Sequence, residues 1–124
     1  MKKINIGIIF GGKSPEHSIS IVSALNIING LNKSEFEISL FAISENNEWL
    51  HKSKSQNIIQ ELNHNQLNNF SYIINPQKNS EIMNESQIKA ELENLDLVFP
   101  CIHGSYGEDG KLQAFLENNN IKFI

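Results

Sequence analysis

Hydrophobic residues gather in two short, nearly continuous runs, and each run predicts a strand that is buried on both faces. The first spans residues 4–10 and stops at Gly11 and Gly12. The second spans residues 96–100, and Pro100 is expected to close it. Strands that are apolar at consecutive positions are typical of parallel sheets covered by helices on both sides. The two runs therefore predict the centre of a parallel sheet.

Apolar residues at three- and four-residue intervals predict a helix over residues 15–29. Ser14 is a suitable N-cap, Pro15 fits the first helical position, and Gly30 marks the exit. The same reasoning predicts two shorter helices, over residues 86–93 and 109–118.

Three further apolar segments predict strands, at residues 36–44, at 48–50 as a hairpin extension of the preceding strand, and at 121–124. The pattern is weak over residues 52–85. There we expect only one or two helical turns at 58–62 and short edge strands at 72–74 and 81–83.

The order of these elements indicates an α/β fold, a Rossmann-like open and mainly parallel sheet flanked by helices. The length, 124 residues of which 40% are hydrophobic, suits a single domain over residues 1–124. Because the last predicted strand runs to Ile124, we expect the parent protein to continue beyond it.

Composition excludes several classes of function. Ten basic residues against 14 acidic ones give a net charge of -4, which disfavours nucleic acid as a partner. The single cysteine, Cys101, cannot form an intramolecular disulfide, and no Cys/His cluster has zinc spacing. No apolar run is long enough for a signal peptide or a membrane helix. We therefore expect a cytoplasmic protein without a structural metal or a membrane partner.

The sequence matches the pattern of a phosphate-binding motif, but the predicted structure does not fit that motif. Gly7, Gly12, Lys13 and Ser14 satisfy the pattern G-x-x-x-x-G-K-[ST]. Three of the four intervening residues belong to the predicted first strand, whereas a phosphate cradle needs them in a loop with their N–H groups turned to the ligand. We therefore reject the P-loop interpretation and expect no nucleotide or metal site in this chain.

In open parallel sheets, ligands bind beyond the carboxyl ends of the strands, and two loops here qualify. In the loop after the first strand, Glu16 lies in the first helical turn, where the helix dipole keeps a carboxylate ionised. An ionised carboxylate above a glycine floor suits a ligand ammonium. The competing interpretation is that Glu16 only complements the dipole.

The second loop follows the strand at residues 96–100. His103 can project its imidazole at the carboxyl end of the strand, and Gly104 allows the backbone to approach a ligand. Glu108 is near enough to hydrogen-bond the imidazole, while Asp109 is a natural N-cap of the next helix. The combination favours a binding site over an isolated surface histidine. His51 and His64 lie outside any such grouping, and we interpret them as surface residues.

Together the two loops resemble the D-alanine:D-alanine ligase family. Residues 103–114, HGSYGEDGKLQA, resemble the signature H-G-x-x-G-E-[DN]-G-x-[LIVMA]-[QSA]-[GSA] at every position. Residues 10–20, FGGKSPEHSIS, are similar to the family's F-G-G-x-S-x-E-H-E-[VI]-S, with Ser18 in place of the usual Glu. The long stretch before His103 resembles the long-form ligases.

This resemblance implies a pre-ATP-grasp domain that binds the first D-alanine of a bacterial ligase of peptidoglycan synthesis. It implies that Glu16 holds the substrate ammonium, that Ile19 packs near the methyl group, and that His103 lies at the carboxylate with Glu108 in support. It further implies that ATP and Mg bind to ATP-grasp domains outside this chain, and that the parent forms a homodimer. The isolated fragment is expected to be inactive.

Two alternatives stay open at this point. A D-alanine:D-lactate or D-alanine:D-serine ligase would share these motifs, because residues beyond Ile124 set the choice of second substrate in the family. A flavodoxin-like binding module is the alternative from a different class, since fold does not fix function.

Overall fold

The computed structural model describes residues 2–12, 17–64, 76, 78–102 and 111–124. Its centre is a three-stranded parallel sheet in the order β2-β1-β3. The strands are β1 (Ile4–Gly11), β2 (Phe36–Ile43) and β3 (Leu97–Ile102). The central strand, β1, pairs with a neighbour on each side, and its sequence is apolar at consecutive positions because its side chains are buried on both faces of the sheet.

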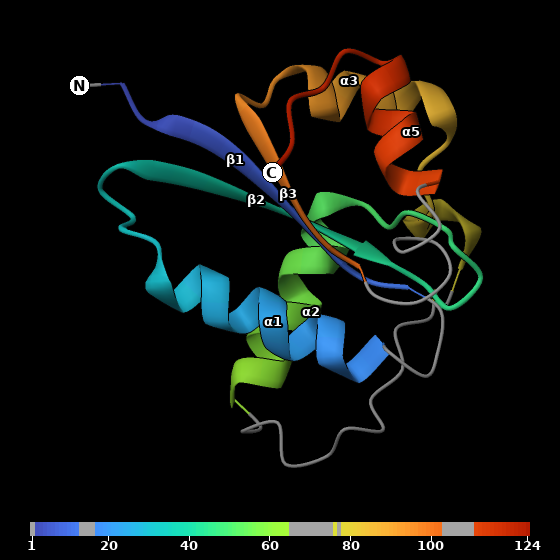
Figure 1. Cartoon of the computed structure of the whole chain (residues 1–124). Helices are drawn as coiled ribbons and strands as arrows, with labels where there is room; N and C mark the ends of the chain where they lie inside the picture. The colour runs from blue at the N-terminus through green and yellow to red at the C-terminus, as the bar shows by residue number, and fades with distance from the viewer. Residues whose placement is uncertain (1, 13–16, 65–75, 77, 103–110) are drawn as a thin grey trace.

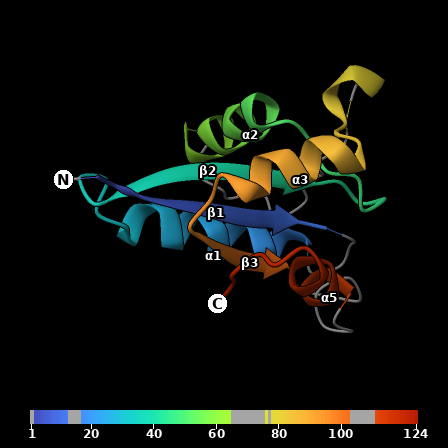
Figure 2. The same ribbon diagram turned by 90° about the horizontal axis from the view of Figure 1, so that it is seen from above.

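Helices cover both faces of this sheet (Figure 1). The helices α1 (His17–Gly30) and α2 (Lys52–His64) lie on one face, and α3 (Glu85–Glu93) and α5 (Lys111–Asn118) lie on the other. Figure 2 looks onto the sheet from above, with β2, β1 and β3 side by side and α1 and α3 overlapping the strands in the view. A short 3-10 helix, η1 (Asn79–Glu81), precedes α3. The predicted α/β fold with an open parallel sheet is confirmed.

Alternate residues of the strands supply two separate hydrophobic cores. Ile8 and Phe10 of β1 point to the face of α1 and α2, whereas Ile9 points to the face of α3 and α5. The first core is completed by apolar residues of both helices, Ile21, Ala24, Leu25, Ile58 and Ile59. The second is completed by Phe41, Trp49, Met83, Ile88, Leu92, Leu112 and Leu116. Each helix layer is therefore anchored independently on its own face.

The strand that the sequence predicts to end at Pro100 extends further in the structure. β3 continues through Cys101 to Ile102, and Pro100 pairs with Ile9 of β1 without interrupting the ladder. The reason lies in the direction of the missing N–H. The Val98 N–H, two residues earlier, bonds to Lys122 on the outer side of β3. Pro100 has the same parity, so its nitrogen also faces away from β1.

The segment between residues 52 and 85 also differs from expectation. The one or two turns predicted at 58–62 are part of the 13-residue helix α2. The predicted edge strand at 81–83 is replaced by the end of η1 and an isolated bridge between Ile82 and Leu50. The predicted strand at 72–74 lies outside the described residues.

Two other predicted strands are reduced to single bridges. Trp49 pairs with Ile43 in the expected hairpin extension of β2, and Phe123 pairs in parallel with Val98 at the outer edge of β3. The hairpin turns at Ser44, whose buried hydroxyl accepts the N–H of Glu48 at 3.1 Å.

Candidate functional site

The two predicted site loops leave the sheet from neighbouring strand ends. Gly11, the last residue of β1, is in parallel register with Ile102, the last residue of β3. Parallel strands present their carboxyl ends at the same edge of a sheet. The chain segments that follow Gly11 and Ile102 therefore begin side by side, as Figure 1 shows for the adjacent ends of the two strands.

Glycines shape the exit from β1. Gly11 and Gly12 have φ values of 99° and 91°, which favour glycine over every other residue. The Gly12 N–H donates to the Ile43 carbonyl at 2.8 Å, and the Gly11 N–H donates to the Ser20 hydroxyl at 2.9 Å. Both N–H groups are thus bonded within the protein rather than turned to a ligand. This agrees with the rejection of the P-loop, whose intervening residues lie in β1.

Ser20 connects the beginning of α1 to both strand ends. Besides accepting the Gly11 N–H, its hydroxyl donates to the carbonyl of Cys101 in β3. The Ser20 side chain is fully buried. In the sequence, Ser20 stands out only as the last residue of the motif at residues 10–20. Its signal was the position itself, a small polar residue on the apolar face of a helix just after a glycine turn.

Cys101 lies beside this site and carries a buried thiol. Burial raises the pKa of its thiol from 9.0 to about 11, because the thiolate would lose its hydration. The residue packs in the first core with 5% of its surface exposed. Its carbonyl accepts the Ser20 hydroxyl.

The groups predicted to bind substrate lie outside the described part of the chain. These are Glu16, His103, Gly104 and Glu108, and the side chain of Ile19, a residue of the first turn of α1. The structure does place the elements that flank them. Glu16 directly precedes α1, and His103 directly follows β3.

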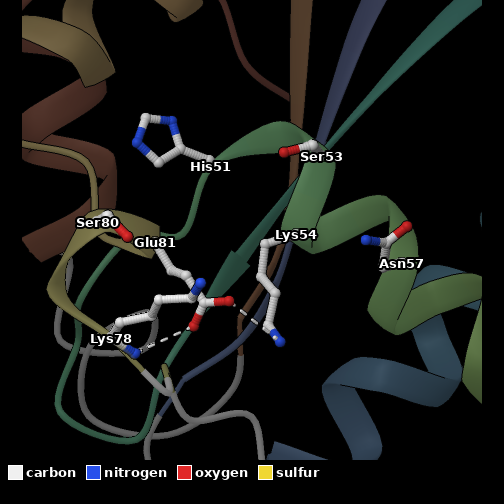
Figure 3. Close-up of a pocket in the computed structure, with 7 residues that line it drawn as sticks. All are labelled: His51, Ser53, Lys54, Asn57, Lys78, Ser80 and Glu81. Atoms are coloured by element: carbon white, nitrogen blue, oxygen red, sulfur yellow. Dashed lines mark hydrogen bonds and ion pairs between the residues drawn. The ribbon is translucent and has the colours of Figure 1, made fainter.

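A separate polar hollow of about 240 Å³ lies at the beginning of α2 (Figure 3). It is lined by His51, Ser53, Lys54, Asn57, Lys78, Ser80 and Glu81. Two of the lining residues contact the Glu81 carboxylate. It lies 3.4 Å from the Lys54 ammonium, and it accepts the Lys78 backbone N–H at 3.3 Å. Of these seven lining residues, only His51 was considered from the sequence, and we interpreted it as a surface residue.

Within the described part of the chain, no group of three or more His, Cys, Asp or Glu residues is arranged to hold a metal ion. None of the described helices is long and apolar enough to cross a membrane.

A parallel sheet with helices on both faces and a glycine turn at its carboxyl edge defines an open-sheet α/β domain, a class of fold whose ligands usually bind at that edge. The family model described as "D-ala D-ala ligase N-terminus" matches residues 5–124. The chain therefore belongs to the D-alanine–D-alanine ligase N-terminal family.

Individual relatives agree with this assignment. The chain is 35% identical to D-alanine–D-alanine ligase A of Escherichia coli over 129 aligned residues, covering all of this chain and 35% of the relative. The chain thus spans about a third of the length of the curated relatives it matches.

Solved structures of ligases share the fold. The D-alanine-D-alanine ligase of Coxiella burnetii has a TM-score of 0.69 at 29% identity, covering 100% of this chain and 35% of that one. The VanG D-Ala:D-Ser ligase of Enterococcus faecalis has a TM-score of 0.65 at 28% identity, covering 99% and 36%. Ligases with different second substrates are therefore about equally similar to this chain.

Proposed function

We propose that this chain is the N-terminal substrate-binding domain of an ATP-dependent ligase that joins two D-alanines for peptidoglycan synthesis in the cytoplasm. The observation that carries the proposal is the parallel register of Gly11 and Ile102. Because of this register, the two loops whose residues resemble the family's motifs begin at neighbouring points of one sheet edge. Loops that converge there are the usual location of ligand sites in such folds.

In this proposal the charges of the two loops match those of a D-amino acid. Glu16, placed just before α1, holds the ammonium of the first D-alanine, and the positive end of the helix dipole keeps its carboxylate ionised. His103, just beyond β3, lies at the substrate carboxylate with Glu108 in support. Ile19 packs near the methyl group, and Gly104 lets the backbone approach the substrate.

The chemistry that follows is an acyl transfer. The first D-alanine carboxylate takes the γ-phosphoryl group of ATP, which leaves ADP. The amine of the second D-alanine then attacks the acyl phosphate, and the peptide bond forms as phosphate departs with the proton of the amine passing to base. We place ATP, Mg and the second substrate on ATP-grasp domains of the parent polypeptide, outside residues 1–124. This chain contributes binding and orientation of the first substrate.

D-serine and D-lactate are the alternative second substrates. The similarity to the VanG D-Ala:D-Ser ligase is 28% identity, against 29% for the Coxiella burnetii ligase, so this domain does not separate the possibilities. We keep D-alanine because the E. coli relative with that name is 35% identical.

The experiment uses the full-length polypeptide that contains this chain. Incubated with ATP, Mg and D-alanine, it should release ADP and D-alanyl-D-alanine in equal amounts, with L-alanine as an inactive control. D-serine and D-lactate offered together with D-alanine identify the second substrate. The isolated 124-residue chain should neither hydrolyse ATP nor bind it at micromolar concentration. Lack of any ATP-dependent coupling by the full-length protein would refute the proposed function, and a flavin titration of the chain then tests the flavodoxin-like alternative.

We also propose that α1 contributes to a homodimer. Ile27 near its C-terminal end and Leu31 just after it are only partly buried against the first core, which leaves apolar surface for a second copy. A symmetric, self-complementary contact is the usual form of such a dimer. Light scattering of the chain at high micromolar concentration should give the mass of a dimer, and a monomer alone would count against it.

A further inference from the structure

We propose that Ser20 is a positioning residue for the first substrate of the ligase reaction, an inference that rests on the proposed function. Its hydroxyl accepts the Gly11 N–H at 2.9 Å and donates to the Cys101 carbonyl. Both hydrogen-bonding roles of the hydroxyl are therefore filled by backbone groups, one on each of the two strands that lead into the site loops.

The place of Ser20 in the chain gives this link its significance. It is the fourth residue of α1, which begins directly after Glu16. Its partner Cys101 belongs to β3 and lies two residues before His103 in the sequence. One buried hydroxyl thus connects the helix that follows Glu16 with the strand that precedes His103, while Gly11 ties both to the end of β1.

Removing the Ser20 hydroxyl takes a hydrogen-bond partner from the Gly11 N–H and from the Cys101 carbonyl at a buried position. Ser20 has no exposed surface and Cys101 has 5%, so water is badly placed to replace the lost bonds. We expect the first turn of α1 to move away from the strand ends until these groups are solvated. A shift of about 1 Å between substrate-holding groups can lower a rate by roughly a hundredfold.

Ser55 offers a matched control on the same face of the sheet. It is the fourth residue of α2, is fully buried, and accepts the Ala42 N–H at 2.8 Å while donating to the His51 carbonyl at 3.0 Å. The chemistry of the link is the same as at Ser20. Its partners lie in β2 and just before α2, however, and not on the strands that lead to the two signature loops.

The test compares Ser20→Ala and Ser55→Ala in the full-length ligase, with steady-state kinetics and thermal unfolding measured side by side. We expect both variants to unfold at a lower temperature. Only Ser20→Ala should raise the KM for the first D-alanine, by roughly tenfold or more, with the KM for ATP within about twofold of wild type. Ser55→Ala should keep wild-type kinetics per folded molecule.

A second variant protects the test against misfolding. Ser20→Cys keeps a side chain of similar shape with a weaker donor, and its KM for the first D-alanine should lie between those of wild type and Ser20→Ala. Unchanged KM in both Ser20 variants, or an equal change in Ser55→Ala, would overturn the inference. A wild-type enzyme without ligase activity would instead remove the proposed function, and this inference with it.

Discussion

Both faces of the sheet hold their helices on an apolar core, but each face adds a different kind of contact. On the face of α1 and α2, the buried hydroxyls of Ser20 and Ser55 bond to strand backbone. On the face of α3 and α5, rings pack against each other, with centroids 6.2 Å apart for Phe41 and Trp49 and 5.9 Å apart for Trp49 and Phe115. Hydrogen bonds are directional and fix a helix along a strand, whereas apolar burial is larger in free energy and less directional. The hydroxyl bonds thus add positional precision on the first face, and the ring contacts add apolar burial on the second.

The largest effect should follow from emptying the second core. Phe41 is fully buried, so Phe41→Ala should lower the free energy of unfolding by about 3–5 kcal/mol through lost burial and the cavity left behind. Phe99→Ala is the control, because Phe99 is only partly buried against the other core. Urea unfolding of both variants measures the difference, and equal losses would contradict the full burial of Phe41 as the source of its effect.

A smaller effect should follow from crowding the same face at Gly7. A Cβ added there would lie 2.5 Å from Leu95 Cδ1 and 3.2 Å from Phe41 Cε2. The Leu95 tip can move, but the buried Phe41 ring has to yield, so Gly7→Ala should cost about 1–3 kcal/mol. Gly30→Ala is the control, since nothing lies within 4 Å of its added Cβ. If thermal unfolding shows the two variants to be equally stable, the tight packing at Gly7 is not a constraint.

The first face should show a weaker, pH-dependent effect at Cys101. Because burial raises the pKa of this thiol from 9.0 to about 11, the unfolded chain loses its thiol proton at lower pH than the folded one. The folded state is therefore favoured below pH 9 and loses this contribution as the pH rises from 9 towards 11. Urea unfolding across that range should show a steeper decline for wild type than for Cys101→Ala. Parallel curves would mean that the thiol is not desolvated.

Most of the fold was predictable because the strands and three of the helices follow simple periodicities. The exception, α2, buries Ser55 beside Ile58 and Ile59, and a polar residue on the inward face weakened the apolar pattern. The extension of β3 past Pro100 depended on which side of the strand the nitrogen faces, which only the pairing of Val98 reveals.

The candidate site was predictable in its location more than in its supports. The glycine turn and the two loops were read from motifs, and their neighbouring origins at Gly11 and Ile102 follow from the parallel order. The hydrogen bond between Ser20 and Cys101 could not be predicted from the sequence, because the two residues are 81 positions apart. Contacts of that kind are fixed by tertiary structure and leave no local periodicity.

The central claim is that the carboxyl edge of β1 and β3 binds the first D-alanine, and Glu16→Gln in the full-length ligase tests it most directly. The substitution keeps the shape of the side chain but removes the charge that faces the substrate ammonium. A charge-assisted hydrogen bond contributes about 1.5–3 kcal/mol, so kcat/KM for the first D-alanine should fall roughly tenfold to a hundredfold. The KM for ATP and the unfolding temperature should stay at their wild-type values. Normal kcat/KM for D-alanine, with a lowered unfolding temperature, would show that Glu16 only complements the helix dipole and would contradict the account.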